Sequence, residues 1–131
     1  MAFFSTRTDY ALILLRALAR TKGFASLRVI AKENKLPYRY TSLLAGELKA
    51  GGFLKSREGV KGGYALSRKP KDIRLIDVIE RMDGPMAPAR CIRTPGSCPR
   101  EASCPIKPHW TKVHRLIYSQ LERHTLVDIS A

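Results

Sequence analysis

Three cysteines, Cys91, Cys98 and Cys104, are the only thiols in this 131-residue sequence, and they lie within fourteen residues of one another. Thiolates are soft ligands that suit zinc or an iron–sulfur cluster. An odd number of cysteines, in a sequence whose start predicts no secretory signal, does not indicate a disulfide framework. The spacing, with six and then five residues between cysteines, therefore predicts a metal-binding or redox-active site.

The segment that carries these cysteines is also rich in proline. Residues 86–109 contain five of the eight prolines in the chain, and Pro85 comes directly before them. Proline fixes φ and lacks a backbone donor, so this density predicts an irregular loop with no secondary structure of its own. Long loops of this kind are usually functional or disordered, and the three thiols favour function.

Hydrophobic periodicity predicts three helices in the first fifty residues. Apolar residues recur at helical spacing over residues 6–19, 27–34 and 40–50. Gly51 and Gly52 should end the third helix. Two short helices joined by a tight turn are typical of a helix-turn-helix.

Strand patterns follow the third helix. Residues 53–57 and 64–67 are predicted to form two strands joined by a glycine-bearing turn, and residues 75–82 to form a fourth helix. A hairpin directly after a helix-turn-helix is a wing. The predicted fold class is therefore mainly α with a small β-hairpin, a winged helix-turn-helix.

The sequence also predicts how the first two helices begin and which side of the third helix is buried. Thr6 and Asp9 have the spacing of a capping box at the start of the first helix. Ser26 is the expected N-cap of the second helix. Leu43 and Leu44 are both expected on the buried side of the third.

A long apolar face marks the end of the chain. Residues 108–124 are predicted to be helical, with Trp110 and Ile117 on one side. So wide an apolar face favours a dimer interface over packing within the chain, which makes this a C-terminal dimerisation helix. Leu126 and Ile129 are expected to pack against that interface.

The chain divides into three predicted regions. Residues 1–84 would form the winged helix-turn-helix domain, residues 85–108 the cysteine- and proline-rich loop, and residues 109–131 the dimerisation helix and tail. The first region carries 17 Lys and Arg against 8 Asp and Glu, out of a net charge of +13 for the chain. That region is therefore the expected partner of a polyanion, although charge by itself fits DNA, RNA or an anionic membrane surface.

Other functional classes are disfavoured by what the sequence lacks. No run of eighteen apolar residues is present, so no membrane span is expected and the predicted location is the cytoplasm. No catalytic triad, phosphate loop or carboxylate pair is visible, so no enzymatic activity is expected. A small iron–sulfur carrier would normally have a fourth cysteine and no basic wing, and it stays a distant alternative.

The wing Gly62-Gly63-Tyr64, together with the three-cysteine loop, resembles the Rrf2 family of bacterial winged-helix regulators. That family includes repressors that respond to iron–sulfur assembly, nitric oxide or iron, and the resemblance covers nearly the whole chain. It implies a homodimer that binds a pseudo-palindromic DNA operator. The third helix would enter the major groove and the wing would approach the minor groove.

Within that arrangement, the positions of the side chains indicate which residues contact DNA. They are polar or basic and lie at the starts of the second and third helices or in the wing: Ser26, Arg39, Tyr40, Thr41, Ser42, Arg57 and Lys61. Tyr40 has an alternative role in the core.

For the cysteine loop, the resemblance implies that Cys91, Cys98 and Cys104 hold an iron–sulfur cluster. The histidine that 2Fe–2S relatives carry three residues after the third cysteine is replaced here by Lys107, and a protonated amine is no ligand. The fourth ligand would be Asp9 of the partner subunit, favoured over His109, and a 4Fe–4S cluster is accordingly favoured over 2Fe–2S. A zinc site or a thiol redox switch without a cluster is the alternative.

Overall fold

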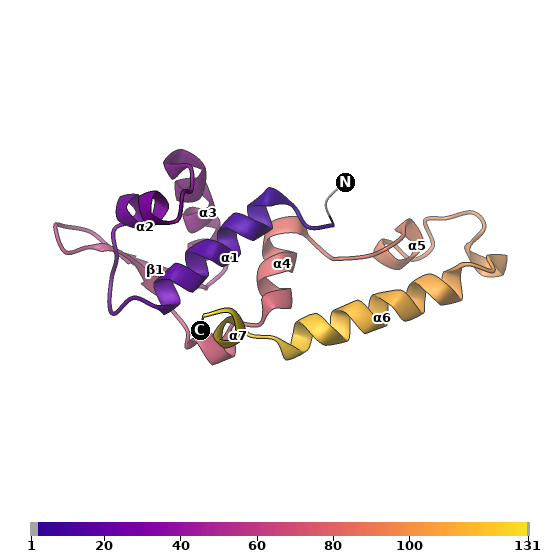
Figure 1. Cartoon of the computed structure of the whole chain (residues 1–131). Coiled ribbons are helices and arrows are strands. Elements are labelled where there is room, and N and C mark those ends of the chain that lie inside the picture. The colour runs from indigo at the N-terminus through magenta and orange to yellow at the C-terminus, as the bar shows by residue number, and fades with distance from the viewer. Residues whose placement is uncertain (1–2, 131) are drawn as a thin grey trace.

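In the computed structural model, which describes residues 3–130, a helical arm projects from a winged core (Figure 1). In chain order the elements are α1 (Thr6–Ala19), α2 (Leu27–Glu33), α3 (Tyr38–Ala50), β1 (Leu54–Arg57), β2 (Gly63–Leu66), the 3-10 helix η1 (Pro70–Asp72), α4 (Leu75–Asp83), α5 (Arg90–Arg93), the 3-10 helix η2 (Glu101–Ser103), α6 (Lys107–Arg123) and α7 (Leu126–Ile129). The predicted fold class, mainly α with one two-stranded hairpin, is confirmed.

Helix α1 lies at the centre of the core, where it packs against α3 and α4. Its buried face consists of Ala11, Leu14, Leu15 and Leu18, which follow the helical spacing of the sequence. Burying each leucine side chain contributes about 1.5–3 kcal/mol, so this face holds the neighbouring helices together.

The start of α1 differs from the prediction. Ser5, not Thr6, is the N-cap, and its side-chain oxygen accepts a hydrogen bond from the backbone N–H of Thr8. The Ser5 backbone N–H and the Thr8 hydroxyl both donate to Asp83 at the end of α4, at 3.1 and 2.7 Å. The predicted capping box of Thr6 with Asp9 is wrong because the cap is built around this contact between the two helices.

Helix α3 also presents a different face from the one expected. Leu44 and Leu48 are buried, as predicted, but Leu43 is 68% exposed. Successive residues of a helix are about 100° apart, and the buried face of α3, formed by Leu44, Ala45 and Leu48, leaves Leu43 on the opposite side. The prediction for Leu43 is therefore wrong.

The wing is an antiparallel pair in which Leu54 lies opposite Leu66, and Ala25 adds an isolated bridge to Tyr64. The two glycines before Tyr64 allow this close pairing. A Cβ on Gly62 would lie 2.1 Å from the carbonyl oxygen of Arg57. A Cβ on Gly63, whose φ is +135°, would lie 2.1 Å from the carbonyl oxygen of Ala25. The double glycine is thus a steric requirement of the hairpin.

The cysteine loop and α6 together make up the arm. The loop has short secondary structure of its own, α5 and η2, so the prediction of none is wrong. Proline prevents a long helix there but leaves room for single turns. None of the residues of α6 is buried, and Trp110 and Leu116 are among the exposed ones.

The chain returns to the core after α6. Leu126 of α7 is fully buried among the residues of the winged core, and its backbone N–H donates to the carbonyl of Ile73. The Arg16 side chain on α1 holds the carbonyl of Ile129 at 2.7 Å. The prediction that Leu126 and Ile129 pack against a dimer interface is wrong, since both lie against their own core. None of the helices in residues 3–130 has the length and apolar character needed to cross a membrane.

Candidate nucleic-acid interface and cysteine loop

The outer face of α3 is a continuous exposed stripe. Arg39, Leu43, Gly46 and Ala50 recur at intervals of four, three and four residues, and all four are exposed. This spacing places them on one side of the helix, opposite the buried Leu48. The stripe is the surface that a helix-turn-helix protein would place in a DNA groove.

The DNA contacts expected on α3 divide into three kinds. Arg39 is exposed and Ser42 is half-buried. Tyr40 is half-buried and packs edge-to-face against Tyr10 of α1, with ring centroids 5.8 Å apart, so it has the alternative core role. Thr41 is fully buried, and its hydroxyl has no hydrogen-bond partner among the described residues. The prediction that Thr41 contacts DNA is wrong, because its side chain is fully buried.

A cation–π pair at the start of α3 was missed from the sequence. The guanidinium of Arg28 on α2 lies 4.1 Å from the ring centroid of Tyr38, the first residue of α3. Both side chains are exposed. Ser26, the N-cap of α2, makes no side-chain capping hydrogen bond. The pairing depends on the angle between the two helices, for which the sequence holds no direct signal.

The wing presents the two basic residues that were expected there. Arg57 and Lys61 are exposed, and the Arg57 guanidinium donates to the Lys61 carbonyl at 3.2 Å. The same guanidinium lies 4.3 Å from the ring centroid of Phe24, and the Lys55 ammonium lies 5.7 Å from it. Phe24 therefore supports two cations of the first wing strand. The sequence analysis did not single out this residue.

The three thiols are all half-buried and free, and basic side chains surround them. The backbone N–H of Arg100, followed by the side chain of Arg90, lowers the pKa of the Cys98 thiol. A hydrogen bond to Glu101 raises the pKa of Lys107, and the nearby thiols of Cys91 and Cys104 add to that effect. This environment favours the anionic form of the Cys98 sulfur.

Glu101 organises the loop, although no sequence motif marks this residue. One carboxylate oxygen accepts from Lys107 Nζ at 2.5 Å, and the other accepts from the backbone N–H of Gly96 at 2.7 Å. The Glu101 side chain is only 14% exposed. Lys107, excluded as a metal ligand on chemical grounds, thus joins the start of α6 to the middle of the loop.

The donor types in the loop suit an iron–sulfur cluster, since three free thiols lie in a positively charged segment. The donors are not gathered in advance: residues 3–130 contain no cluster of three or more His, Cys, Asp or Glu placed to hold a metal. Asp9, in the first turn of α1, and His109, in the first turn of α6, are both exposed. The loop therefore contains suitable ligand types, but it would have to close around a cofactor to bring them together.

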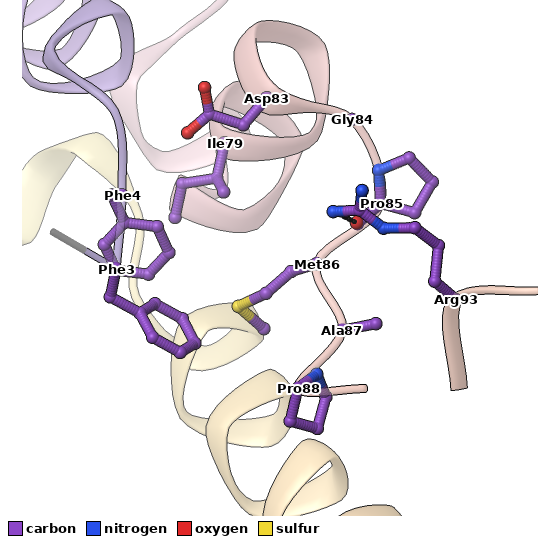
Figure 2. Close-up of a pocket in the computed structure, with 10 residues that line it drawn as sticks. All are labelled: Phe3, Phe4, Ile79, Asp83, Gly84, Pro85, Met86, Ala87, Pro88 and Arg93. Carbon is purple, nitrogen blue, oxygen red and sulfur yellow. Dashed lines mark hydrogen bonds between the residues drawn. The ribbon is translucent and has the colours of Figure 1, made fainter. Parts of the chain in front are cut away.

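A cavity of about 310 Å³ marks the junction between the core and the loop. Figure 2 shows Phe3 and Phe4 on one side, Pro85 and Arg93 on the other, and Met86 between them. Arg93 donates to the Pro85 carbonyl at 3.2 Å, which ties α5 to the end of α4.

Known proteins resemble this chain over almost its whole length. Residues 4–131 match the model of a family described as Rrf2, iron-dependent transcriptional regulator. The curated regulator CymR of Bacillus subtilis is 30% identical over 129 residues, covering 97% of this chain and 88% of CymR.

Solved structures show the same fold over almost the whole chain. The B. subtilis CymR structure, titled the global cysteine regulator, superposes with a TM-score of 0.80 at 29% identity, covering 99% of this chain and 97% of that one. An oxidized form of Staphylococcus aureus CymR gives 0.77 at 30% identity, covering 99% and 96%. IscR of T. potens gives 0.75 at 30% identity, covering 95% and 83%. These proteins are regulators and not enzymes, in agreement with the prediction.

Proposed function

The chain belongs to the Rrf2 family of transcriptional regulators, and from this we infer that it is a homodimeric repressor that binds a pseudo-palindromic DNA operator. We further propose that the state of its cysteine loop sets the affinity for that operator. The observation that carries the DNA-binding proposal is the exposed stripe of α3 together with the basic wing.

Recognition would use contacts of two kinds. Arg39 and Leu43 on the α3 stripe would face base edges in the major groove. Ser26, Arg28 and Arg57 lie at helix starts or in the wing, where side chains commonly bind phosphates or the minor groove. Phosphate contacts would supply most of the affinity and make it depend on salt.

Dimerisation would use the apolar face of α6. Trp110, Val113 and Leu116 are exposed on this helix, and Leu116 lines an almost wholly apolar hollow with Phe3 and Phe4. Exposed apolar surface of this extent is typical of an interaction site. A second copy of the chain would cover it and fix the distance between the two α3 helices.

The cofactor proposed for the loop is an iron–sulfur cluster held by Cys91, Cys98 and Cys104, with 4Fe–4S favoured over 2Fe–2S. Asp9 of the partner subunit is the proposed fourth ligand, and His109 is the alternative. When bound, a cluster would react with oxygen or nitric oxide and would depend on the availability of iron. The competing proposal is a switch made by the thiols themselves or by zinc, in which the lowered pKa of the Cys98 thiol favours its ionisation.

Two contacts support coupling between the loop and the DNA-binding face. The loop begins beside Asp83, whose carboxylate binds Ser5 and Thr8 at the start of α1. Tyr118 of α6 donates to Glu80 of α4 at 3.1 Å. Helix α1 packs directly on α3. A rearrangement of the loop or of α6 would therefore shift α1 and, through it, the spacing of the two recognition helices in a dimer.

The decisive test is native mass spectrometry and visible absorption on protein purified without oxygen. The expected result is a dimer with four irons and four sulfides per subunit that loses them in the Cys98→Ala variant while remaining a dimer. Two irons and two sulfides would direct mutagenesis to His109. Zinc, or free thiols without metal, would overturn the cluster and leave the thiol switch.

DNA binding is tested separately, by selection from random duplex DNA followed by affinity measurements at fixed salt. The loaded and cofactor-free forms should bind the selected site with different affinities. Equal affinities would overturn control by the loop. Failure to select any sequence would overturn the repressor function itself.

A further inference from the structure

The one large apolar side chain on the outer stripe of α3 is Leu43, which is 68% exposed near the middle of the helix. Its sequence neighbour Leu44 is 1% exposed, so the helix is firmly oriented and Leu43 is held away from the core. Single exposed leucines are common on protein surfaces. The position of Leu43, at the centre of the proposed DNA-contacting face, is what gives it a role.

The surroundings of Leu43 leave it free to approach a base pair. Gly46, one turn later on the same stripe, has no side chain, and a Cβ built there would meet nothing within 4 Å. Arg39, one turn earlier, is exposed and can extend to hydrogen-bond acceptors on bases or phosphates. The stripe thus offers a charged group, an apolar group and a gap, in that order along the helix axis.

We propose that Leu43 is a specificity-determining residue that reads thymine by packing against its C5-methyl group in the major groove of each half-site. The inference rests on the proposed DNA-binding function. Leucine has no donor or acceptor, so it cannot distinguish bases by hydrogen bonds. The thymine methyl is the one apolar group that an unmodified base pair presents in the major groove, and apolar side chains pack against it.

The size of the effect follows from the area involved. Burying one methyl-sized group contributes about 0.8 kcal/mol, which is about a fourfold change in affinity for each half-site. Because Leu43 lies outside the core, replacing it should leave the folded domain intact. Both expectations can be measured on the full chain.

The experiment begins with the site selected from random duplex DNA by the reduced, oxygen-free protein. Each thymine is then replaced in turn by deoxyuridine, which lacks only the C5-methyl, and affinity is measured by fluorescence anisotropy at fixed salt. At one position in each half-site, the replacement should weaken the wild-type protein about fourfold. The same replacement should leave the affinity of Leu43→Ala unchanged.

Two comparisons make the outcome decisive. Val127→Ala, another exposed apolar residue but on α7, should retain the full sensitivity to deoxyuridine. A deoxyuridine effect of equal size in wild type and in Leu43→Ala would overturn the assignment even if the variant binds more weakly. A change in oligomeric state in Leu43→Ala would show that Leu43 contacts protein and would also overturn it. Absence of any selected sequence would instead remove the proposed function, and the inference with it.

Discussion

The guanidinium carbon of Arg57 lies 4.3 Å from the centroid of the Phe24 ring, which joins the end of the first wing strand to the segment between α1 and α2. The two residues are 33 positions apart in the chain. The stack holds the cation at the turn end of the first wing strand and restricts its rotamers before DNA arrives. Less conformational entropy is then lost on binding.

We therefore expect Phe24→Leu to weaken binding to the selected operator about two- to fivefold, the equivalent of one exposed cation–π pair. Arg57→Ala should weaken it further and lower the salt dependence by about one counterion. The measurement is a salt titration by fluorescence anisotropy, with Arg123→Ala on α6 as the matched charge control. If Phe24→Leu weakens DNA binding by the Arg57→Ala variant as much as by the wild type, Phe24 does not act through its stack on Arg57.

Gly63→Ala should destabilise the protein by more than about 2 kcal/mol, since the new Cβ would meet the Ala25 carbonyl at a backbone conformation unsuited to alanine. Gly46→Ala is the control: it lies in α3 with open space around it, and helix propensity predicts stabilisation of up to about 1 kcal/mol. Urea unfolding followed by circular dichroism measures both. Equal stability of the two variants would mean that the wing does not pair closely with Ala25.

Leu126→Ala should lower the free energy of unfolding by about 2–5 kcal/mol, because its fully buried side chain leaves a cavity in the winged core. Its neighbour Val127 is 52% exposed, and Val127→Ala should change stability by less than about 0.5 kcal/mol. Sedimentation velocity on both variants tests the alternative that Leu126 belongs to the dimer contact. A weakened dimer with unchanged core stability would contradict the packing described here.

Asp83 makes the free energy of unfolding depend on pH in the acidic range. Burial by itself would raise its pKa, but hydrogen bonds from Ser5 and Thr8, together with the Arg7 charge, lower the pKa below its ordinary value. The stabilisation is therefore fully present above the unfolded-state pKa, near 4, and is lost as the pH falls through the lower folded-state value.

Asp83→Asn should accordingly reduce stability at neutral pH and remove part of the loss seen below about pH 4. We expect a cost of about 1 kcal/mol at pH 7, small because the carboxylate is exposed and screened by solvent. Urea unfolding at about ten evenly spaced values between about pH 2.5 and 7 measures how the free energy of unfolding changes with pH. Thr8→Val combined with Asp83→Asn should cost less than the sum of the two single changes, and full additivity would argue against a shared contact.

The sequence predicted the elements well where a single local rule applies. Helical periodicity placed α1 at residues 6–19, and Gly51 and Gly52 ended α3. The double glycine of the wing was recognised as a motif, and the close approach of Ala25 explains it physically. The three cysteines and the charge of the first region were equally plain from composition and spacing.

What the sequence left open depends on contacts between elements that lie far apart in the chain. Whether Leu43 or Thr41 faces the core is decided by how α1 and α2 pack against α3. Ser5 caps α1 and binds Asp83, which is 78 residues away in sequence but adjacent in space. Leu126 looked like part of an apolar α6 surface, yet the turn after α6 returns it to the core. Periodicity says which residues share a face, but only tertiary packing decides what that face meets.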